Sequence, residues 1–167
     1  MSARTVIDSL DFVQTGREMR GTVPLANLER LADTLHDTGG GLMFTLKGGY
    51  DGRHRPRLML QVSGTLRLQC QRCLGLLEFP LQIDSTLLLL REGDAAEGAV
   101  DDPLAPDAIE ASPELDIDSL IEDEILLGLP LAPKHAEGAC EKQAALTPPE
   151  AANASAFAEK LEAWKKL

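Results

Sequence analysis

Apolar and polar residues alternate through most of the segment from residue 42 to residue 90. The apolar positions of this pattern are, in order, Leu42, Phe44, Leu46, Leu58, Leu60, Val62, Leu66, Leu68, Leu77, Phe79, Leu81 and Ile83. Spacing of two, with short glycine-containing connections, is typical of antiparallel strands that are buried on one face. The pattern predicts a β-meander of about five to six strands, either open or partly closed into a barrel. Pro80 places its own strand at an edge or a bulge.

Helical patterns flank the strands, so the predicted fold class is α+β. Before them, Leu25, Leu28, Leu31 and Leu35 form an apolar stripe at helical spacing, which the glycines of residues 39–41 end. The stripe predicts a helix that begins near Pro24.

After the strands, a second helical stripe contains Ile117, Leu120, Ile121 and Ile125. Asp116 is suited to the N-cap of this helix, and Pro130 ends it. Three acids, Glu122, Asp123 and Glu124, share one turn of the helix. They are either a partner-binding cluster or an ordinary solvated face.

The 167 residues suit one domain, which we place at residues 1–142. Residues 92–115 lack periodicity and are predicted to form a long acidic loop. Residues 143–154 have the composition of a linker. Residues 155–167 are predicted to form a short helix, in which Phe157, Leu161 and Trp164 recur at helical spacing; Phe157 and Trp164 are candidate partner-binding residues.

The net charge of −11 is unevenly distributed. Residues 42–91 carry a net +4, whereas residues 92–124 hold thirteen acids and no Lys or Arg. The basic block is the part of the chain with the right sign to contact a polyanion, although a solvated sheet face explains the same residues. The candidate RNA-binding residues are Lys47, Arg53, Arg55, Arg57, Arg67 and Arg72. The acidic run suits either a basic protein partner or a solubilising loop.

The composition also sets expectations about location. The longest apolar runs, such as residues 87–90, fall far short of a membrane span. Three cysteines do not make a disulfide framework, and an odd count favours reduced thiols in the cytoplasm. We therefore expect a cytoplasmic protein without membrane or DNA partners.

Cys70 and Cys73 form a C-x-x-C pair between two predicted strands. Two thiolates on a tight turn can hold one metal ion, and structural zinc takes four ligands. His135 and Cys140, which follow the second helix, supply the remaining candidate ligands. The alternatives are inert thiols and a redox pair, but a redox pair usually begins a helix, whereas a strand pattern follows Cys73.

The segment 68–73 and the segment 115–135, followed by Cys140, together resemble the YceD family of large ribosomal RNA subunit accumulation proteins. Members pair a C-x-R-C turn with an acidic helix, a Leu-Pro-x-x-Pro-x-His segment and a later Cys. The Pro that often precedes the terminal helix of the family is absent here. The matching residues are Cys70, Arg72, Cys73, Asp116, Glu122, Asp123, Glu124, Pro130, Pro133, His135 and Cys140.

This resemblance implies a non-enzymatic role in the accumulation or processing of large-subunit (23S) ribosomal RNA. The expected partners are that RNA, its precursor particle, or a basic large-subunit ribosomal protein. Two alternatives stay open: a protein-interaction adaptor with a structural zinc site, and an enzyme, either a thiol oxidoreductase that uses the C-x-x-C pair or an acid–base hydrolase.

Overall fold

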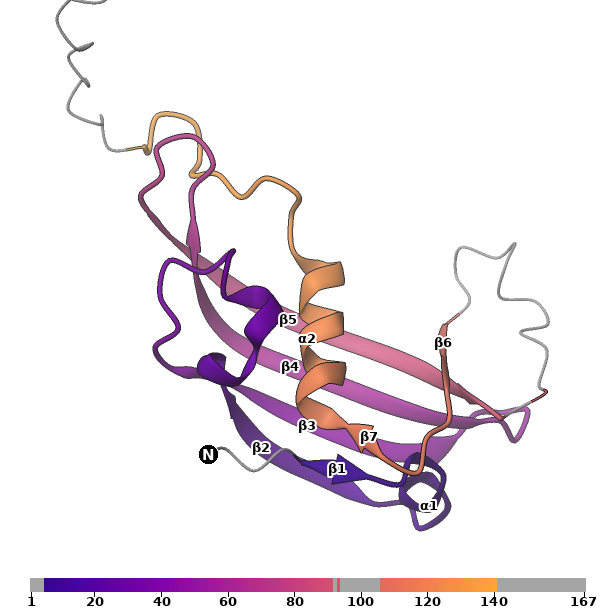
Figure 1. The fold of residues 1–167 in the computed structure, drawn as a ribbon. Helices are drawn as coiled ribbons and strands as arrows, with labels where there is room; N and C mark the ends of the chain where they lie inside the picture. The colour runs from indigo at the N-terminus through magenta and orange to yellow at the C-terminus, as the bar shows by residue number, and fades with distance from the viewer. Residues whose placement is uncertain (1–4, 92, 94–105, 141–167) are drawn as a thin grey trace, which may run out of the picture.

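The computed structural model describes residues 5–91, 93 and 106–140. Its main element is a five-stranded sheet with the strand order β2-β3-β4-β5-β6. Four strands, β2 (Glu18–Pro24), β3 (Gly41–Tyr50), β4 (Pro56–Gln69) and β5 (Leu76–Leu90), follow one another along the chain, and each is antiparallel to the next. The sheet is curved and not closed (Figure 1). The predicted α+β class and antiparallel meander are therefore confirmed.

The fifth strand of the sheet departs from the meander. β6 (Asp107–Glu110) runs parallel to the end of β5, pairing with Leu87–Leu90. It lies within the segment predicted to be a loop, so that prediction is wrong for residues 107–110; residues 92 and 94–105 of the same segment lie outside the described residues. The predicted linker 143–154 and terminal helix 155–167 also lie outside them.

Pro80 lies at an edge of the sheet, one of the two positions predicted for it. It is paired with Thr65 of β4 on one side, whereas β6 reaches only the last four residues of β5. In the described part of the chain, β5 therefore has one neighbouring strand at Pro80. A residue without an amide hydrogen is tolerated in such a position because no ladder bond is lost.

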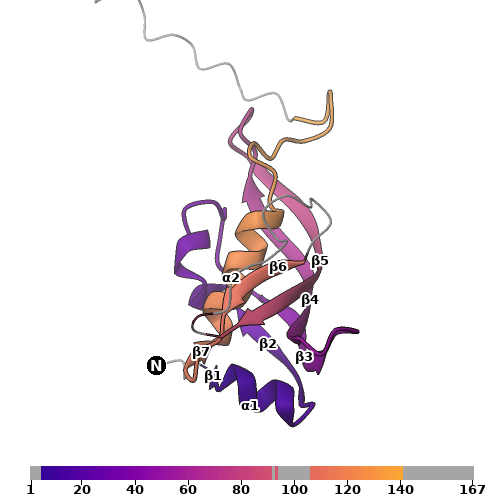
Figure 2. The ribbon, with the colours of Figure 1, turned by 90° about the vertical axis from the view of Figure 1, so that its right-hand side faces the viewer.

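Helix α2 (Ile117–Gly128) packs across one face of the sheet (Figures 1 and 2). Asp116 caps it as predicted, because its carboxylate accepts hydrogen bonds from the amides of Asp118 and Ser119. The chain enters α2 through β7 (Leu115–Asp116), which pairs with β1 (Val6–Ile7).

A short helix, α1 (Ser9–Gln14), precedes the sheet, with Asp8 as its N-cap. It packs against β3 at Gly48, where a Cβ would meet the carbonyl oxygen of Phe12 at 2.7 Å and the Cα of Val13 at 2.8 Å. The absence of a side chain at Gly48 therefore allows the helix to lie directly on the strand.

The helix predicted from the stripe at residues 25–35 does not form. The chain instead makes two 3₁₀ turns, η1 (Leu25–Asn27) and η2 (Glu29–Leu31), separated by Leu28 in a non-helical conformation. The apolar residues of the stripe are nevertheless buried in the core. The amides of Arg30 and Leu31 donate to the carboxylate of Glu122 on α2, a long-range acceptor that replaces the helical carbonyls.

Candidate functional site

A tight turn joins β4 to β5 and carries two of the cysteines. The amide of Leu74 donates to the carbonyl of Cys70 at 2.8 Å, and the amide of Cys70 donates to the carbonyl of Gly75 at 2.9 Å. Leu74 has a φ of 58°, the left-handed conformation that closes the turn. The amide of Arg72 points at the Sγ of Cys70 at 3.5 Å. The turn thus folds its own amides around one sulfur.

The segment that follows α2 runs back to this turn (orange in Figure 1). The amide of Gln71 donates to the carbonyl of Pro133 at 2.9 Å, and the guanidinium of Arg72 donates to the carbonyl of His135 at 3.4 Å. These contacts bring His135 and Cys140 beside two cysteines that lie more than 60 positions earlier in the chain.

Cys70, Cys73, His135 and Cys140 form one compact cluster, as the sequence predicted. One potential ligand atom from each lies within 4.8 Å of those of the other three. The Sγ atoms of Cys70 and Cys140 are 3.9 Å apart, and the Nδ1 of His135 is 3.4 Å from the Sγ of Cys73 and 3.7 Å from that of Cys140. Sulfurs bound to one tetrahedral zinc ion lie about 3.8 Å apart, so the cluster has the dimensions of a zinc site.

The imidazole of His135 is held in the orientation that a metal ligand needs. Its Nε2 lies 2.8 Å from the backbone carbonyl oxygen of Leu76. Because a carbonyl oxygen only accepts, Nε2 carries the proton and Nδ1 keeps its lone pair directed toward the sulfurs. This is the arrangement by which outer hydrogen bonds fix the tautomer of metal-binding histidines.

The thiols of the cluster have divergent acidities. The amide of Cys73, with the neighbouring amide of Arg72, lowers the pKa of Cys70 to about 5, although burial opposes this effect. Burial and the adjacent thiols of Cys73 and Cys70 raise the pKa of Cys140 to about 11. In the absence of a cation, negative charge on one sulfur disfavours it on the next. A metal ion would remove this conflict and favour thiolates at all three cysteines.

The geometry favours a ligand set over a redox pair. Cys70 is completely buried, and the C-x-x-C sequence forms a turn between strands instead of starting a helix. A third sulfur and an imidazole nitrogen converge on the pair. With all four positions filled by protein atoms, such a site would be closed and structural.

The candidate RNA-binding residues separate into two groups. Arg53, Arg55 and Arg57 lie at or beside the β3–β4 turn, whereas Arg67 and Arg72 lie toward the opposite end of β4. Ten residues of extended strand separate Arg57 from Arg67, a distance of about 33 Å. The six residues therefore do not form one continuous patch.

Several of these bases are engaged with nearby groups. Lys47 is ion-paired with Glu18, and Arg67 with Asp37. The bond from Arg72 to the carbonyl of His135 ties that base to the cluster. Among the six candidates, the structure shows no acidic partner for Arg53 and Arg57, near the β3–β4 turn, or for Arg72, beside the cysteine cluster.

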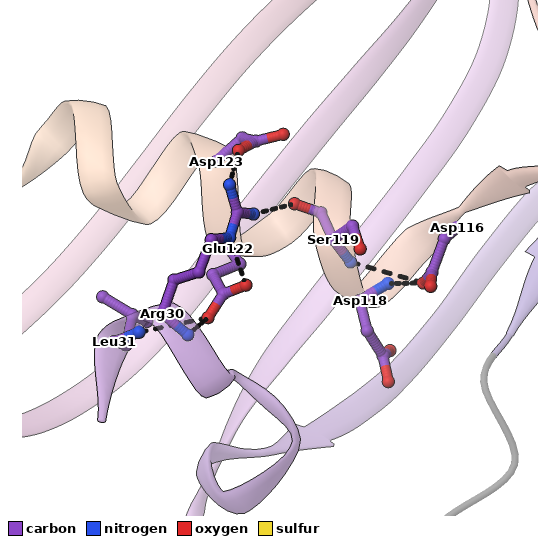
Figure 3. A network of polar contacts seen from close by, with 7 residues as sticks. All are labelled: Arg30, Leu31, Asp116, Asp118, Ser119, Glu122 and Asp123. Atoms are coloured by element: carbon purple, nitrogen blue, oxygen red, sulfur yellow. Dashed lines mark hydrogen bonds and ion pairs between the residues drawn. The ribbon is translucent and has the colours of Figure 1, made fainter. Parts of the chain in front are cut away.

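The acidic residues of α2 have separate roles (Figure 3). The buried carboxylate of Glu122 accepts from the amides of Arg30 and Leu31 at 2.6 and 3.1 Å, and from Nε of Arg30 at 2.8 Å. Asp123 pairs with the same guanidinium but is half exposed. Sequence reasoning missed Arg30, because nothing local distinguishes it from a surface arginine.

Glu124 is also buried, and its carboxylate accepts from the hydroxyl of Ser85 on β5. Glu122 and Glu124 are therefore committed to contacts inside the protein, and Asp123 is the member of the three that faces solvent. The other two candidate partner-binding residues, Phe157 and Trp164, lie outside the described residues.

A polar cleft of about 430 Å³ lies between the 3₁₀ turns and the start of α2. Its lining includes the acids Glu29, Asp116, Asp118 and Glu122, together with Arg30. The cleft is thus predominantly acidic, and it is separate from the cysteine cluster at the far end of α2.

The fold and the cluster define a small α+β protein with a Cys₃His candidate metal centre. The chain belongs to the family described as "Large ribosomal RNA subunit accumulation protein YceD", whose model matches residues 58–167. A relative with that name from Haemophilus influenzae is 28% identical over 140 residues, which cover 83% of this chain and 79% of the relative. No solved structure matches.

In the part of the chain that the structure describes, no helix is long and apolar enough to cross a membrane.

Proposed function

We propose that this protein is a non-enzymatic, cytoplasmic factor that supports the accumulation of large-subunit ribosomal RNA. The observation that carries the proposal is the family match over residues 58–167, which spans both halves of the cysteine cluster, nearly all of β4, β5 and β6, and α2. The factor acts by binding precursor ribosomal RNA or a large-subunit ribosomal protein, and its effect is to protect or shape a particle during assembly.

The charge distribution supports contact with RNA. The β3–β4 turn offers bases in a chain whose overall charge is −11. The net acidity disfavours indiscriminate binding to nucleic acids, because long-range attraction to phosphate is weak. Local contact at a basic turn is compatible with a factor that recognises one region of a precursor and later leaves it.

The acidic cleft supports a second candidate, an adaptor that binds a basic ribosomal protein. Glu29 is exposed in its lining, and Asp118 is partly exposed, so these carboxylates are available to Lys or Arg side chains. Co-purification of one basic protein after nuclease treatment would favour this candidate. Loss of all partners on nuclease treatment would favour RNA.

We also propose that the cluster of Cys70, Cys73, His135 and Cys140 binds a structural zinc ion. The ion would tie the β4–β5 turn to the segment after α2. The fixed tautomer of His135 and the ligand separations support zinc over inert thiols. The complete burial of Cys70 disfavours redox catalysis, because a reactive thiolate must be accessible to its partner.

Depletion of the protein, followed by sucrose-gradient profiling, tests the proposed function. We expect a selective loss of large subunits, with precursor particles or unpaired small subunits in their place. Re-expression of the wild-type chain should restore the profile. A normal profile in depleted cells would contradict the proposal.

A further inference from the structure

Helix α2 leaves one of its sides exposed to solvent, while the opposite side is buried in the core. Its exposed side chains are Ser119, Asp123, Leu126 and Leu127, which we call the outward face of α2. Residues three or four positions apart lie next to one another on a helix surface, so these side chains share one side of the helix. Along the described residues, this face is therefore open to a partner.

The first half of the outward face borders the acidic cleft between the 3₁₀ turns and α2 (Figure 3). Asp118 accepts a hydrogen bond at 3.1 Å from the amide group of Asn27, a neutral donor that does not compensate its charge. Glu29 is exposed in the cleft lining and has no ion pair among the described residues. Arg30, the one base of the lining, is already ion-paired to α2. This end of the face therefore attracts cations and repels phosphate.

The second half of the outward face is apolar. Leu126 and Leu127 lie one helical turn beyond Asp123, and Leu127 is 76% exposed. Leu131, in the segment that follows the helix, is fully exposed, although this segment is anchored to the β4–β5 turn through the carbonyl of Pro133. Single exposed leucines are ordinary on a protein surface, but three within six positions are typical of an interface.

We propose that the outward face of α2 binds a basic segment of a large-subunit ribosomal protein, with Lys or Arg at the acidic half and an apolar side chain at the leucines. The inference rests on the proposed function, whose adaptor candidate it deepens by naming the docking surface. Asp118 and Leu127 are nine positions apart, a rise of about 14 Å along the helix. The partner segment must therefore carry its basic and apolar groups about that far apart.

A polypeptide fits this face better than the other cations and polymers of a ribosomal particle. RNA is disfavoured because the acidic half repels its phosphates. A polyamine matches the charge of the cleft but has no apolar side chain to cover Leu126 and Leu127. Complementary charge combined with an apolar anchor is the usual composition of a specific protein interface.

Binding of the full-length chain to RNA-free protein extracted from large ribosomal subunits tests this inference. Captured proteins are identified by mass spectrometry, and their dissociation constants are then measured with each variant. We expect a basic protein to bind, and Leu127→Gln to weaken its binding about tenfold, because the substitution removes an apolar anchor. Met43→Gln is the matched control. Met43 is 63% exposed, but it lies on the sheet face directed away from α2, between the core residues Leu42 and Phe44.

The acidic half has its own variants. Asp118→Asn and Glu29→Gln remove charge and keep polar side chains of similar shape. Each should weaken binding about threefold at low salt and less at high salt, because exposed charge pairs are screened. Glu78→Gln removes an exposed charge from β5 and should leave binding unchanged. Thermal unfolding of each variant checks the fold, and the exposure of Leu127 makes its variant the least disruptive.

Three results would overturn the docking surface. A captured protein that binds the Leu127, Asp118 and Glu29 variants as it binds the wild type would place the contact elsewhere. Capture of no large-subunit protein would exclude such a partner, and capture only after ribosomal RNA is added back would assign the contact to RNA. The proposed function is tested separately by the ribosome profile after depletion, so a selective loss of large subunits would leave it standing even if this surface bound nothing.

Discussion

His135 donates a hydrogen bond from Nε2 to the backbone carbonyl of Leu76, at 2.8 Å. Leu76 is the first residue of β5, and His135 belongs to the segment beyond α2. This bond links the orientation of a candidate metal ligand to the start of the longest strand in the described structure.

Protein purified without a His-tag should contain about one zinc ion per chain, measured by mass spectrometry of the metal content. Cys70→Ser, Cys73→Ser and Cys140→Ser should each lose most of the zinc, because structural sites need all four ligands. His36→Gln is the matched control, since His36 lies outside the cluster. Zinc-free wild-type protein would exclude the site.

Zinc should also stabilise the fold. Bound at about a thousand times its Kd, it would raise the free energy of unfolding by about 4 kcal/mol. Urea titrations with and without a chelator measure the difference. Equal urea midpoints with and without the chelator would show that no bound metal stabilises the native state.

Glu122→Ala should destabilise the protein by about 3 kcal/mol, because it leaves the amides of Arg30 and Leu31 and part of the Arg30 guanidinium without their acceptor. Asp123→Ala removes the exposed ion pair of the same arginine and should cost less than about 1 kcal/mol. Urea unfolding compares the two variants. A similar cost for both would mean that burial does not distinguish these carboxylates.

Gly48→Ala should be clearly destabilising, by about 1–3 kcal/mol, because the added Cβ meets the backbone of Phe12 and Val13 at distances below 3.0 Å. Gly49→Ala is the control in the same strand, where the nearest atom is the methyl group of Met59 at 3.6 Å. Thermal unfolding should show a large loss for the first substitution and a small change for the second. The reverse order would contradict the contact between α1 and β3.

The stability of the β3–β4 turn should depend on pH. Hydrogen bonds from the amide and side chain of Arg55, together with the amide of Arg53, hold the pKa of Asp51 below its ordinary value of 3.8. A carboxyl with a lowered folded-state pKa stabilises the protein above its ordinary pKa, and this contribution disappears as the pH falls through the folded-state value.

Wild-type protein should therefore melt at a higher temperature than Asp51→Asn at neutral pH, and the difference should shrink in strong acid. Asp33→Asn is the comparison, as an acid for which the structure shows no ion pair. A difference that stays constant down to pH values well below 3.8 would rule out this role for the Asp51 charge.

Features encoded by local spacing were predictable from the sequence. The alternation of residues 42–90 identified the long strands, and Asp116 identified the start of α2. The cluster was also predictable, because the chain has only three cysteines and three histidines from which to draw soft ligands. The residues that decide the strands and the N-cap lie close together in the sequence, and the residues that decide the cluster are rare in it.

Features decided by distant contacts were not predictable. The stripe at residues 25–35 has helical spacing, but Glu122, about 90 positions away, captures the amides that a helix would use. The same contact buries an acid that the sequence placed in a solvated or partner-binding cluster. Ion pairing and the length of β4 likewise divide the basic block into two groups, and neither is visible in a charge count.

The two ends of β4 carry different chemistry. One end adjoins the β3–β4 turn with its arginines, and the other adjoins the cluster of Cys70, Cys73, His135 and Cys140. With 14 residues, the strand measures about 43 Å along its length. One strand therefore holds two chemically distinct sites apart, so that a change at one end of β4 leaves the contacts at the other end untouched.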